Sequence, residues 1–304
     1  LSLGLQSADN ALLKRLGRIH TYEDFEHSFY MAREAGFDNI SADMISGIPG
    51  DTPGNLEKGL EKVLSLRPEH LSVYSLIIEE NTPFYTLYGP SGTESSWLPD
   101  EDEERSQVKL TKRVLESHGY CQYEISNFAL PGFSSSHNTG YWTQEMYLGY
   151  GAAAASFIRK DGGWESAFRI KNREVLRDYL KGYEEYEELS KEDLMAEFMI
   201  LGLRMVKGVN DDTFIGRYGV SFFERYGKVL DVHVDRFFPV PEEIRDRPGD
   251  EEHGKRAPVH RRPRDHHQIP EYRVFQGRHD QASDLGGSRA VFNGHFDLHC
   301  PHVL

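Results

Sequence analysis

The sequence is poor in cysteine and has no long apolar run, and both shortages exclude whole classes of protein. Its 304 residues include two cysteines, Cys121 and Cys300, which lie too far apart in sequence to indicate a disulfide framework or a cysteine metal motif. No apolar stretch approaches the roughly 20 residues of a membrane span, and no signal peptide opens the chain. These features predict a cytoplasmic protein with no integral membrane segment.

Basic residues are also scarce relative to acidic ones. The chain has 35 Lys and Arg against 49 Asp and Glu, a net charge of −14. Nucleic-acid backbones favour clustered basic residues, so this balance argues against a nucleic-acid partner. It leaves small anionic ligands open. The hydrophobic content of 38% is ordinary for a globular protein.

One pattern, an apolar run followed by an amphipathic helix, is present three times in the first eighty residues. The apolar runs are residues 1–6, 39–46 and 70–78, and the helical patterns are residues 9–16, 22–35 and 53–66. Strands that alternate with helices predict an α/β fold with a parallel sheet. Ligands of such sheets bind at the carboxyl ends of the strands. We therefore expect a site near Gln6, Asp43, Ile77 and the loop 47–52 (GIPGDT).

Two features of this region have more than one interpretation. Asp43 lies among apolar neighbours in a predicted buried strand, where a carboxylate needs partners. Either a structural hydrogen bond or a ligand contact would explain it. The glycines of the loop 47–52 could serve phosphate binding, but the loop lacks the lysine of a P-loop. A tight turn from strand to helix explains it better.

The middle of the chain continues the α/β pattern. Acidic residues at 100–104 begin a helix that runs to Gly119, and residues 120–128 predict another strand. His137 then stands among aromatic and polar residues. It could face an aromatic ligand or a metal-bearing macrocycle, although a packed, hydrogen-bonded histidine is the commoner role. The small residues at 149–156 predict that the backbone there approaches some other group closely.

The carboxyl-terminal part predicts helices followed by an irregular tail. Residues 169–189 have a charged, helical period, and a buried helix carrying Leu194 and Phe198 is expected to end at Gly208. Helices at 211–218 and 221–230 complete a small helical domain. From residue 232 the periodicity stops, and the tail holds nine of the fourteen histidines. We interpret this tail as a disordered product of a reading-frame error, and no regular spacing favours a metal site at His266 and His267.

Several separated stretches together resemble one family. They are LSLGLQSADNALLKRLGRIHT (1–21), AREAGFDNISADMISGIPGDT (32–52), RPEHLSVYSLIIEENTPFY (67–85), LPDEDEE (98–104), YEISNFALPG (123–132) and HNTGYW (137–142). The chain thereby resembles the radical S-adenosylmethionine (SAM) proteins related to oxygen-independent coproporphyrinogen III oxidase. LGRIHT and HNTGYW look closer to the haem chaperone HemW-like branch. The resemblance runs from Leu1 to about Asp231.

The resemblance implies a fold and a domain arrangement. It implies a radical SAM partial (β/α)6 barrel, incomplete at its amino terminus, over residues 1–157. A truncated helical domain of the HemN type would follow at 158–231, and then the aberrant tail at 232–304. In the family, a CxxxCxxC loop ligates a [4Fe-4S] cluster, and reduction of the cluster cleaves SAM to a deoxyadenosyl radical.

The resemblance also implies roles for particular residues. Gln6, Arg18, Asp43 and Ile77 take the positions that contact SAM. Arg18 would pair with the SAM carboxylate, Gln6 and Asp43 would take its polar groups, and Ile77 would pack on the adenine. His137 is the candidate for haem contact. No residue of this chain is assigned a catalytic or metal-ligating role.

The departures from the family decide the functional expectation. CxxxCxxC and the glycine-rich SAM motif are absent and would lie before Leu1, which already sits in a strand-like run. Asp51 stands where the family usually shows Gln. We expect a piece of a radical SAM protein of porphyrin metabolism, a haem chaperone that binds haem and passes it to acceptor proteins, inert by itself in radical chemistry. The alternatives are a true coproporphyrinogen III decarboxylating oxidase and an unrelated α/β barrel without SAM affinity.

Overall fold

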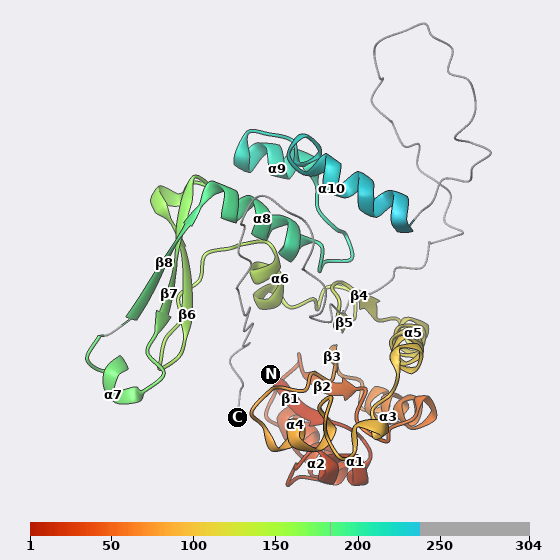
Figure 1. Cartoon of the computed structure of the whole chain (residues 1–304). Helices are drawn as coiled ribbons and strands as arrows, with labels where there is room; N and C mark the ends of the chain where they lie inside the picture. Colours follow the sequence, from red (N-terminus) through yellow and green to blue (C-terminus); the bar gives the residue numbers. More distant parts are fainter. Residues whose placement is uncertain (183, 238–304) are drawn as a thin grey trace, which may run out of the picture. The chain divides into compact units, whose positions relative to one another are not determined.

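The computed structural model describes residues 1–182 and 184–237. The chain divides into two units, Leu1–Arg225 and Tyr226–Leu304, and of the second unit only residues 226–237 are described. The first unit mixes helices with two sheets (Figure 1), so it has the predicted α/β character. Most of the tail predicted from residue 232 lies outside the described residues.

The first sheet, as far as the chain is described, contains five strands in the order β1-β2-β3-β5-β4. Strands β1 (Ser2–Gln6), β2 (Ser41–Ser46) and β3 (His70–Ser75) are parallel neighbours, as the three repeated patterns predict. Helices α1 (Asn10–Arg15) and α2 (Tyr22–Glu34) connect β1 to β2, and α3 (Pro53–Ser65) connects β2 to β3. Each crossover supplies the helix that a parallel pair requires.

Local capping residues set where these helices begin. Thr21 and Asp24 form a capping box at α2. The Thr52 hydroxyl accepts a hydrogen bond from the Asn55 N–H, and Pro53 occupies the first turn of α3. Gly36, with φ of 89°, lets the chain leave α2 in a left-handed conformation.

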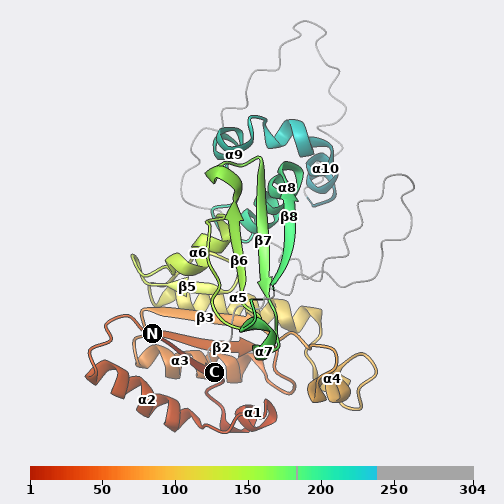
Figure 2. The same ribbon diagram turned by 90° about the vertical axis from the view of Figure 1, so that its left-hand side faces the viewer.

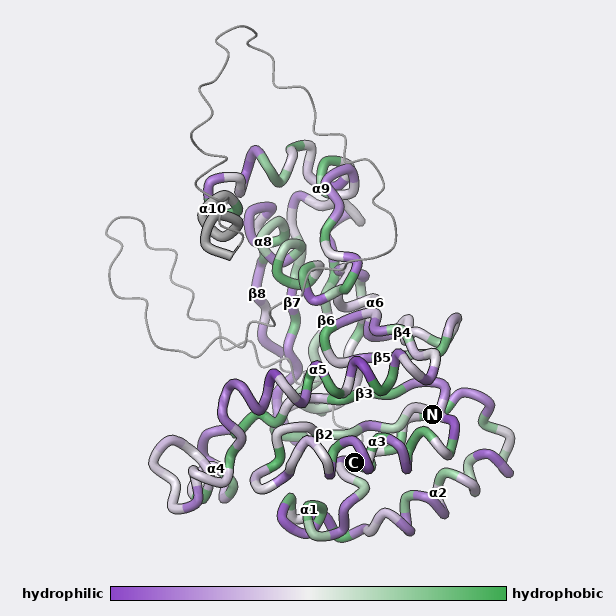
Figure 3. The backbone as a smooth tube through the Cα atoms, turned by 90° about the vertical axis from the view of Figure 1, so that its right-hand side faces the viewer, coloured by the Kyte–Doolittle hydropathy of each residue, from purple (hydrophilic) through white to green (hydrophobic). Residues whose placement is uncertain are grey.

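Helices α2, α3 and α5 (Glu101–Ser117) bury one face of this sheet (Figure 2). Apolar and polar positions alternate along the backbone of the first sheet and its helices (Figure 3), and the buried apolar side chains of these elements form one core. Phe29 of α2, Leu60 of α3 and Leu115 of α5 are each at most 1% exposed. The opposite face of the sheet is left uncovered by this helical layer.

The segment 120–128 forms a hairpin rather than the single strand expected from its sequence. Short strands β4 (Cys121–Gln122) and β5 (Asn127–Ala129) pair antiparallel, and β5 also pairs with β3. Between them the chain turns, because Ser126 N–H donates to the buried Glu124 carboxylate and Glu124 bridges to Met205. One of the two contacts that interrupt the strand, the bridge to Met205, comes from a segment about eighty residues further on.

The second sheet corrects the helix expected at residues 169–189. Strands β6 (Ala155–Arg159), β7 (Ser166–Asn172) and β8 (Glu184–Ser190) form an antiparallel sheet, with the short α7 (Leu176–Tyr179) between β7 and β8. Arg169 lies opposite Glu187 in the pairing, 3.3 Å away. The charges that suggested a solvated helix therefore pair across strands.

The helices of the carboxyl-terminal part differ from expectation in their ends. They are α8 (Lys191–Gly202), α9 (Asp211–Tyr218) and α10 (Phe222–Phe237). Helix α9 is as predicted. Helix α8 ends at Gly202 rather than Gly208, because Val209 folds back so close that a Cβ at position 202 would lie 2.6 Å from its Cγ1. Helix α10 continues to Phe237, beyond the expected end at 230.

Other elements complete the described chain: α4 (Pro83–Tyr88), the 3₁₀ turns η1 (Ser95–Trp97) and η2 (Lys160–Gly162), and α6 (Ser136–Trp142). The predicted close approach at 149–156 is confirmed, since a Cβ at Gly149 would collide with the Ala155 carbonyl. Within residues 1–182 and 184–237, no helix has both the length and the apolar character needed to cross a bilayer.

Candidate functional site

The face of the first sheet that α2, α3 and α5 do not cover is polar; it is partly exposed at β2 and buried at β3 and β5, where Ser72 and Asn127 are 3% and 2% exposed. Across neighbouring strands, Gly4 pairs with Asp43, Asp43 with Ser72, and Ser72 with Asn127. Because side chains alternate along a strand, these positions share one face, and their apolar neighbours such as Ala42 point into the helical core. A row of polar groups therefore crosses the sheet on the side away from the helices.

Asp43 is the charged group of this row. Its Oδ2 accepts a hydrogen bond of 2.7 Å from the Ser2 hydroxyl, and its Oδ1 accepts one of 3.2 Å from the Ser41 hydroxyl. The residue is only half-buried. Since an ionised carboxylate accepts about four hydrogen bonds, the two serines leave acceptor capacity for a ligand. Both interpretations of Asp43 thus find a physical basis in one residue.

Gln6 lies on the same face as Asp43. It ends β1 with φ of 73°, and the pairing of β1 with β2 slips by one residue between Gly4 and Gln6. A Cβ at Gly4 would lie 2.8 Å from the Gln6 Nε2, so the amide folds back over position 4. Position 4 shares its face with Ser2, whose hydroxyl reaches Asp43. Gly4 thus makes room for a carboxamide beside the carboxylate.

Arg18 lies in the loop that follows α1. The ring Nε2 of His20 is 3.1 Å from the Leu5 carbonyl oxygen, which anchors this loop beside the end of β1. Arg18 is exposed, and among the described residues no hydrogen bond or ion pair engages its guanidinium. A cation in this position is available to an anionic group of a ligand.

Ile77 follows the end of β3 and is 75% exposed. Such exposure of an isoleucine next to a polar face offers an apolar surface to a ligand. Gln6 thus lies at the end of β1, Asp43 within β2 and Ile77 two residues after β3, with Arg18 beside the end of β1. Contact of all four with one molecule stays a prediction.

His137 lies apart from these four residues in sequence, in the first turn of α6. The sequence did not indicate this helix, which Ser135 begins by accepting a hydrogen bond from the Asn138 N–H. The imidazole is exposed and meets the Tyr141 ring edge-on at 4.9 Å between centroids, and Tyr141 in turn meets Tyr147 at 4.7 Å. An accessible histidine oriented by an aromatic ring is suited to ligate a haem iron.

Three residues that sequence reasoning missed join the polar face to α6. Ser41 Oγ is 2.8 Å from His70 Nδ1, and His70 Nε2 is 2.9 Å from the Tyr123 hydroxyl. Burial lowers the pKa of His70, against the opposing charge of Asp43. Burial raises the pKa of Tyr123 to about 12. The alternation of polar residues in β2 and β3 was the available signal for Ser41 and His70.

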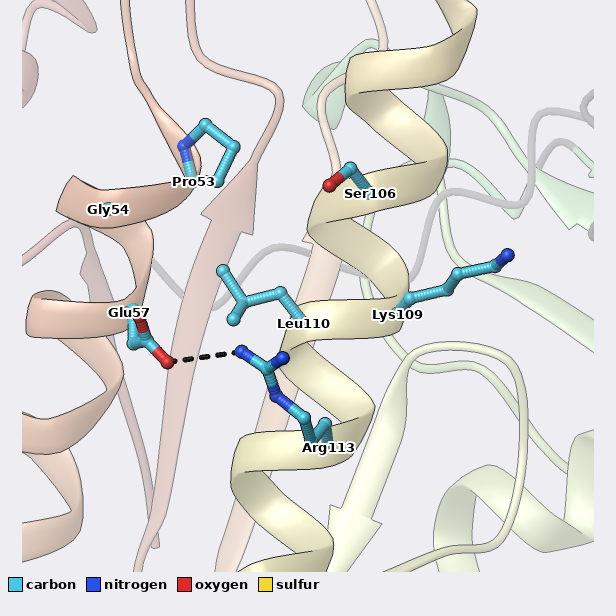
Figure 4. Close-up of a pocket in the computed structure, with 7 residues that line it drawn as sticks. All are labelled: Pro53, Gly54, Glu57, Ser106, Lys109, Leu110 and Arg113. Atoms are coloured by element: carbon cyan, nitrogen blue, oxygen red, sulfur yellow. Dashed lines mark hydrogen bonds and ion pairs between the residues drawn. The ribbon is translucent and has the colours of Figure 1, made fainter.

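A groove elsewhere on the chain does not coincide with the predicted site. It lies between α3 and α5, where Glu57 and Arg113 approach to 3.2 Å above Leu110 (Figure 4). These helices cover the opposite face of the sheet from Asp43. The groove is therefore separate from the polar face.

The described residues do not fit an iron–sulfur cluster. The described cysteine, Cys121, is exposed and single. No group of three His, Cys, Asp or Glu side chains in the described part of the chain could hold a metal ion. Since a [4Fe-4S] cluster is held by cysteine thiolates, its ligands would have to come from other residues.

Family models match both ends of the described chain. Residues 1–63 match the radical SAM superfamily model, and residues 189–234 match the HemN C-terminal domain model. A solved structure, titled "Coproporphyrinogen III oxidase (HemN) from Escherichia coli is a Radical SAM enzyme", superimposes with a TM-score of 0.61 at 19% identity. It covers 78% of this chain and 56% of that one. The chain has the fold of the radical SAM proteins related to HemN.

Sequence relatives make the assignment more specific. The heme chaperone HemW of Bacillus subtilis is 40% identical over 237 residues, which cover 76% of this chain and 60% of that protein. HemW of Lactococcus lactis is 37% identical over 76% of this chain and 59% of the relative. A mitochondrial radical S-adenosyl methionine domain-containing protein 1 of Danio rerio is 31% identical over 68% of this chain and 48% of that protein. The chain belongs to the HemW-like radical SAM family, and it spans about 60% of the length of its bacterial relatives named here.

Proposed function

We propose that this chain is the ligand-binding part of a haem chaperone that binds SAM on the polar face of its first sheet and haem at α6. The observation that carries the SAM site is that the Gln6 amide and the Asp43 carboxylate, both partly exposed, share the face of the sheet that the helices do not cover. Kinship with proteins named heme chaperone HemW supports the haem part.

Each SAM residue has a distinct task in this proposal. Arg18 pairs with the carboxylate of the methionine moiety, as a guanidinium does with bidentate geometry. Asp43 accepts hydrogen bonds from the ligand through the capacity left by Ser2 and Ser41, and Gln6 adds an amide donor and acceptor. Ile77 covers the adenine. In this family SAM supplies radical chemistry together with a cluster, for which the described residues hold no ligands.

The haem part depends on His137. Its imidazole binds the iron, and Tyr141 holds the ring by an edge-on contact. Transfer to an acceptor protein requires that this ligand be reachable, which agrees with an exposed ring on a short helix. A cytoplasmic location and haem-acceptor partners belong to the same proposal.

Haem titration followed by absorbance tests the haem site. His137→Ala should weaken haem binding about tenfold, a loss of about 1.4 kcal/mol. His27→Ala, which removes an exposed histidine of α2, is the matched control and should leave the affinity within about twofold. The other histidines of the chain are common to both variants, so the difference between them measures position 137. Equal affinities for the two variants would contradict haem ligation by His137.

Equilibrium dialysis with SAM tests the adenosyl site. Asp43→Asn keeps the shape of the side chain and removes its charge, and it should weaken SAM binding about tenfold. Arg33→Lys changes a cation of the helical layer and should leave SAM affinity unchanged. In a protein that also carries the cluster cysteines, release of carbon dioxide from coproporphyrinogen with SAM and a reductant would identify the decarboxylating oxidase instead.

A further inference from the structure

A continuous series of hydrogen bonds leads from Asp43 across the sheet to the start of α6. Ser41 lies between Asp43 and His70, with Oγ 3.2 Å from Asp43 Oδ1 and 2.8 Å from His70 Nδ1. His70 Nε2 is 2.9 Å from the Tyr123 hydroxyl, which accepts a bond of 3.3 Å from the Ser135 N–H. These residues belong to β2, β3, the β4–β5 hairpin and the cap of α6, and all lie within the first unit.

The donors and acceptors in this series allow the hydrogen bonds to run in one direction only, from Tyr123 as first donor to Asp43 as last acceptor. Tyr123 oxygen receives hydrogen bonds from the Ser135 N–H and the Asn138 side chain, so its own O–H is the group left to donate. The O–H points to His70 Nε2, which must then be the unprotonated ring nitrogen. In neutral imidazole the proton is consequently on Nδ1, where it donates to Ser41. The Ser41 hydroxyl in turn donates its only proton to the Asp43 carboxylate.

Burial keeps water from substituting for the partners of His70, the central member of this hydrogen-bonded series. His70 is 5% exposed, and burial lowers its pKa. A lowered pKa favours the neutral ring, in which Nε2 accepts from Tyr123 and Nδ1 donates to Ser41. A buried group that loses its partner has no solvent to replace it. The orientation of the Ser41 hydroxyl is therefore set by its two hydrogen-bond partners, His70 and Asp43.

We propose that His70 is a positioning residue for the adenosyl ligand: its Nδ1–H turns the Ser41 hydroxyl onto Asp43 and so fixes the carboxylate orientation that receives SAM. Tyr123 fixes the tautomer of His70 that makes this possible. The role of His70 rests on the proposed SAM site. If the ring held its proton on Nε2, Ser41 would donate to Nδ1 and release the Asp43 oxygen.

Two substitutions at position 70 separate positioning from packing. In His70→Asn the amide nitrogen takes the place of Nδ1 and can still donate to Ser41. In His70→Gln the amide reaches toward the place of Nε2 and Tyr123, so the donor to Ser41 is lost. We expect His70→Asn to keep SAM affinity within about threefold and His70→Gln to weaken it about tenfold, measured by equilibrium dialysis with the full chain. Thermal unfolding of both variants shows that they are folded.

The tautomer provides a readout that does not depend on SAM. Nitrogen NMR shifts of the His70 ring should report Nδ1–H in the unaltered protein. Tyr123→Phe removes the O–H donor, so the population should move toward Nε2–H and SAM affinity should fall by a severalfold factor. The Nδ1–H form in the unaltered protein and its loss in Tyr123→Phe would support the proposed direction.

Different failures refute different claims. An Nε2–H tautomer in the unaltered protein would refute the proposed direction of the hydrogen bonds, whether or not SAM binds. Equal SAM affinities for His70→Asn and His70→Gln, with Asp43→Asn still impaired, would leave the SAM site standing and overturn the positioning role of His70. Absence of SAM binding to the unaltered chain, with the Nδ1–H tautomer present, would refute the adenosyl site and with it the role of His70 toward that ligand.

Discussion

Replacing Asp51 by asparagine should stabilise the protein at neutral pH. Asp51 lies in the loop 47–52, and its Oδ1 accepts a hydrogen bond of 2.8 Å from the N–H of the next residue, Thr52. Burial raises the pKa of this carboxyl to about 6, although the Thr52 bond opposes the rise, and the charge of Asp9 raises it further. Asparagine keeps the Oδ1 acceptor and removes the charge. The substitution therefore relieves the unfavourable term and retains the favourable one.

The sign and size of the effect follow from the pKa. A carboxyl whose folded pKa is raised contributes stability below its unfolded value near 3.8, and this contribution is lost as the pH rises through about 6. A shift of about two units corresponds to roughly 3 kcal/mol. Asp51 is only partly buried, so solvent screening reduces this to about 1–2 kcal/mol. The gain should be present at pH 7.5 and should vanish near pH 4.

Thermal unfolding at the two pH values measures this gain. For a unit of this size, 1–2 kcal/mol corresponds to a rise in Tm of about 2–8 °C. Asp38→Asn, at an exposed aspartate before β2, is the control and should shift Tm by less than about 1 °C at either pH. A lower Tm for Asp51→Asn at pH 7.5, or a gain that persists unchanged at pH 4, would refute the assignment of a desolvated carboxylate to Asp51.

Three further substitutions test the packing. Glu197→Gln should destabilise the chain by about 3 kcal/mol in urea unfolding, because Glu197 is 8% exposed and its carboxylate is 2.7 Å from the Arg169 guanidinium. Glu187→Gln, at an exposed partner of the same arginine, should cost under about 1 kcal/mol. Equal losses for the two variants would contradict a difference between the buried and the exposed ion pair. Gly149→Ala should lower Tm strongly, since its Cβ would meet the Ala155 carbonyl; an unchanged Tm would mean that this approach is not tight. Thr52→Ala should cost about 1 kcal/mol through loss of the α3 cap, whereas Thr86→Ala, in the short α4, should be near neutral; the reverse order would contradict the cap.

The parts of the fold that the sequence predicted are those decided locally. Each βα repeat is encoded in a short stretch of sequence, and the structure has the three repeats where they were expected, with the local caps Thr21 and Thr52 at the starts of α2 and α3. Residues 169–189 were predicted wrongly as a helix because their charges find partners across strands, as Arg169 does in Glu187. The periodicity of polar and apolar residues within a short segment does not report pairing between residues so far apart in sequence.

The same distinction separates the parts of the candidate site. Gln6 and Asp43 come from motifs that carry the family resemblance, and the structure sets them on one face of the sheet, while their joint contact with SAM remains a prediction. Ser41, His70 and Tyr123 come from three elements, and each taken alone suits an ordinary structural role. The register of β2 with β3 pairs Ser41 with His70, and the pairing of β5 with β3 places the β4–β5 hairpin so that Tyr123 reaches His70.

Strand β1 forms one margin of the first sheet, and within the described residues β2 is its sole pairing partner. About half of its backbone N–H and C=O groups therefore face outward and make no hydrogen bonds to a neighbouring described strand. Such a margin is a template for a further extended segment, whether from the same polypeptide or from a second molecule. At high concentration the isolated chain should accordingly tend to associate through β1, and a lysine introduced at the exposed Ser2 would discourage this at the expense of one hydrogen bond to Asp43.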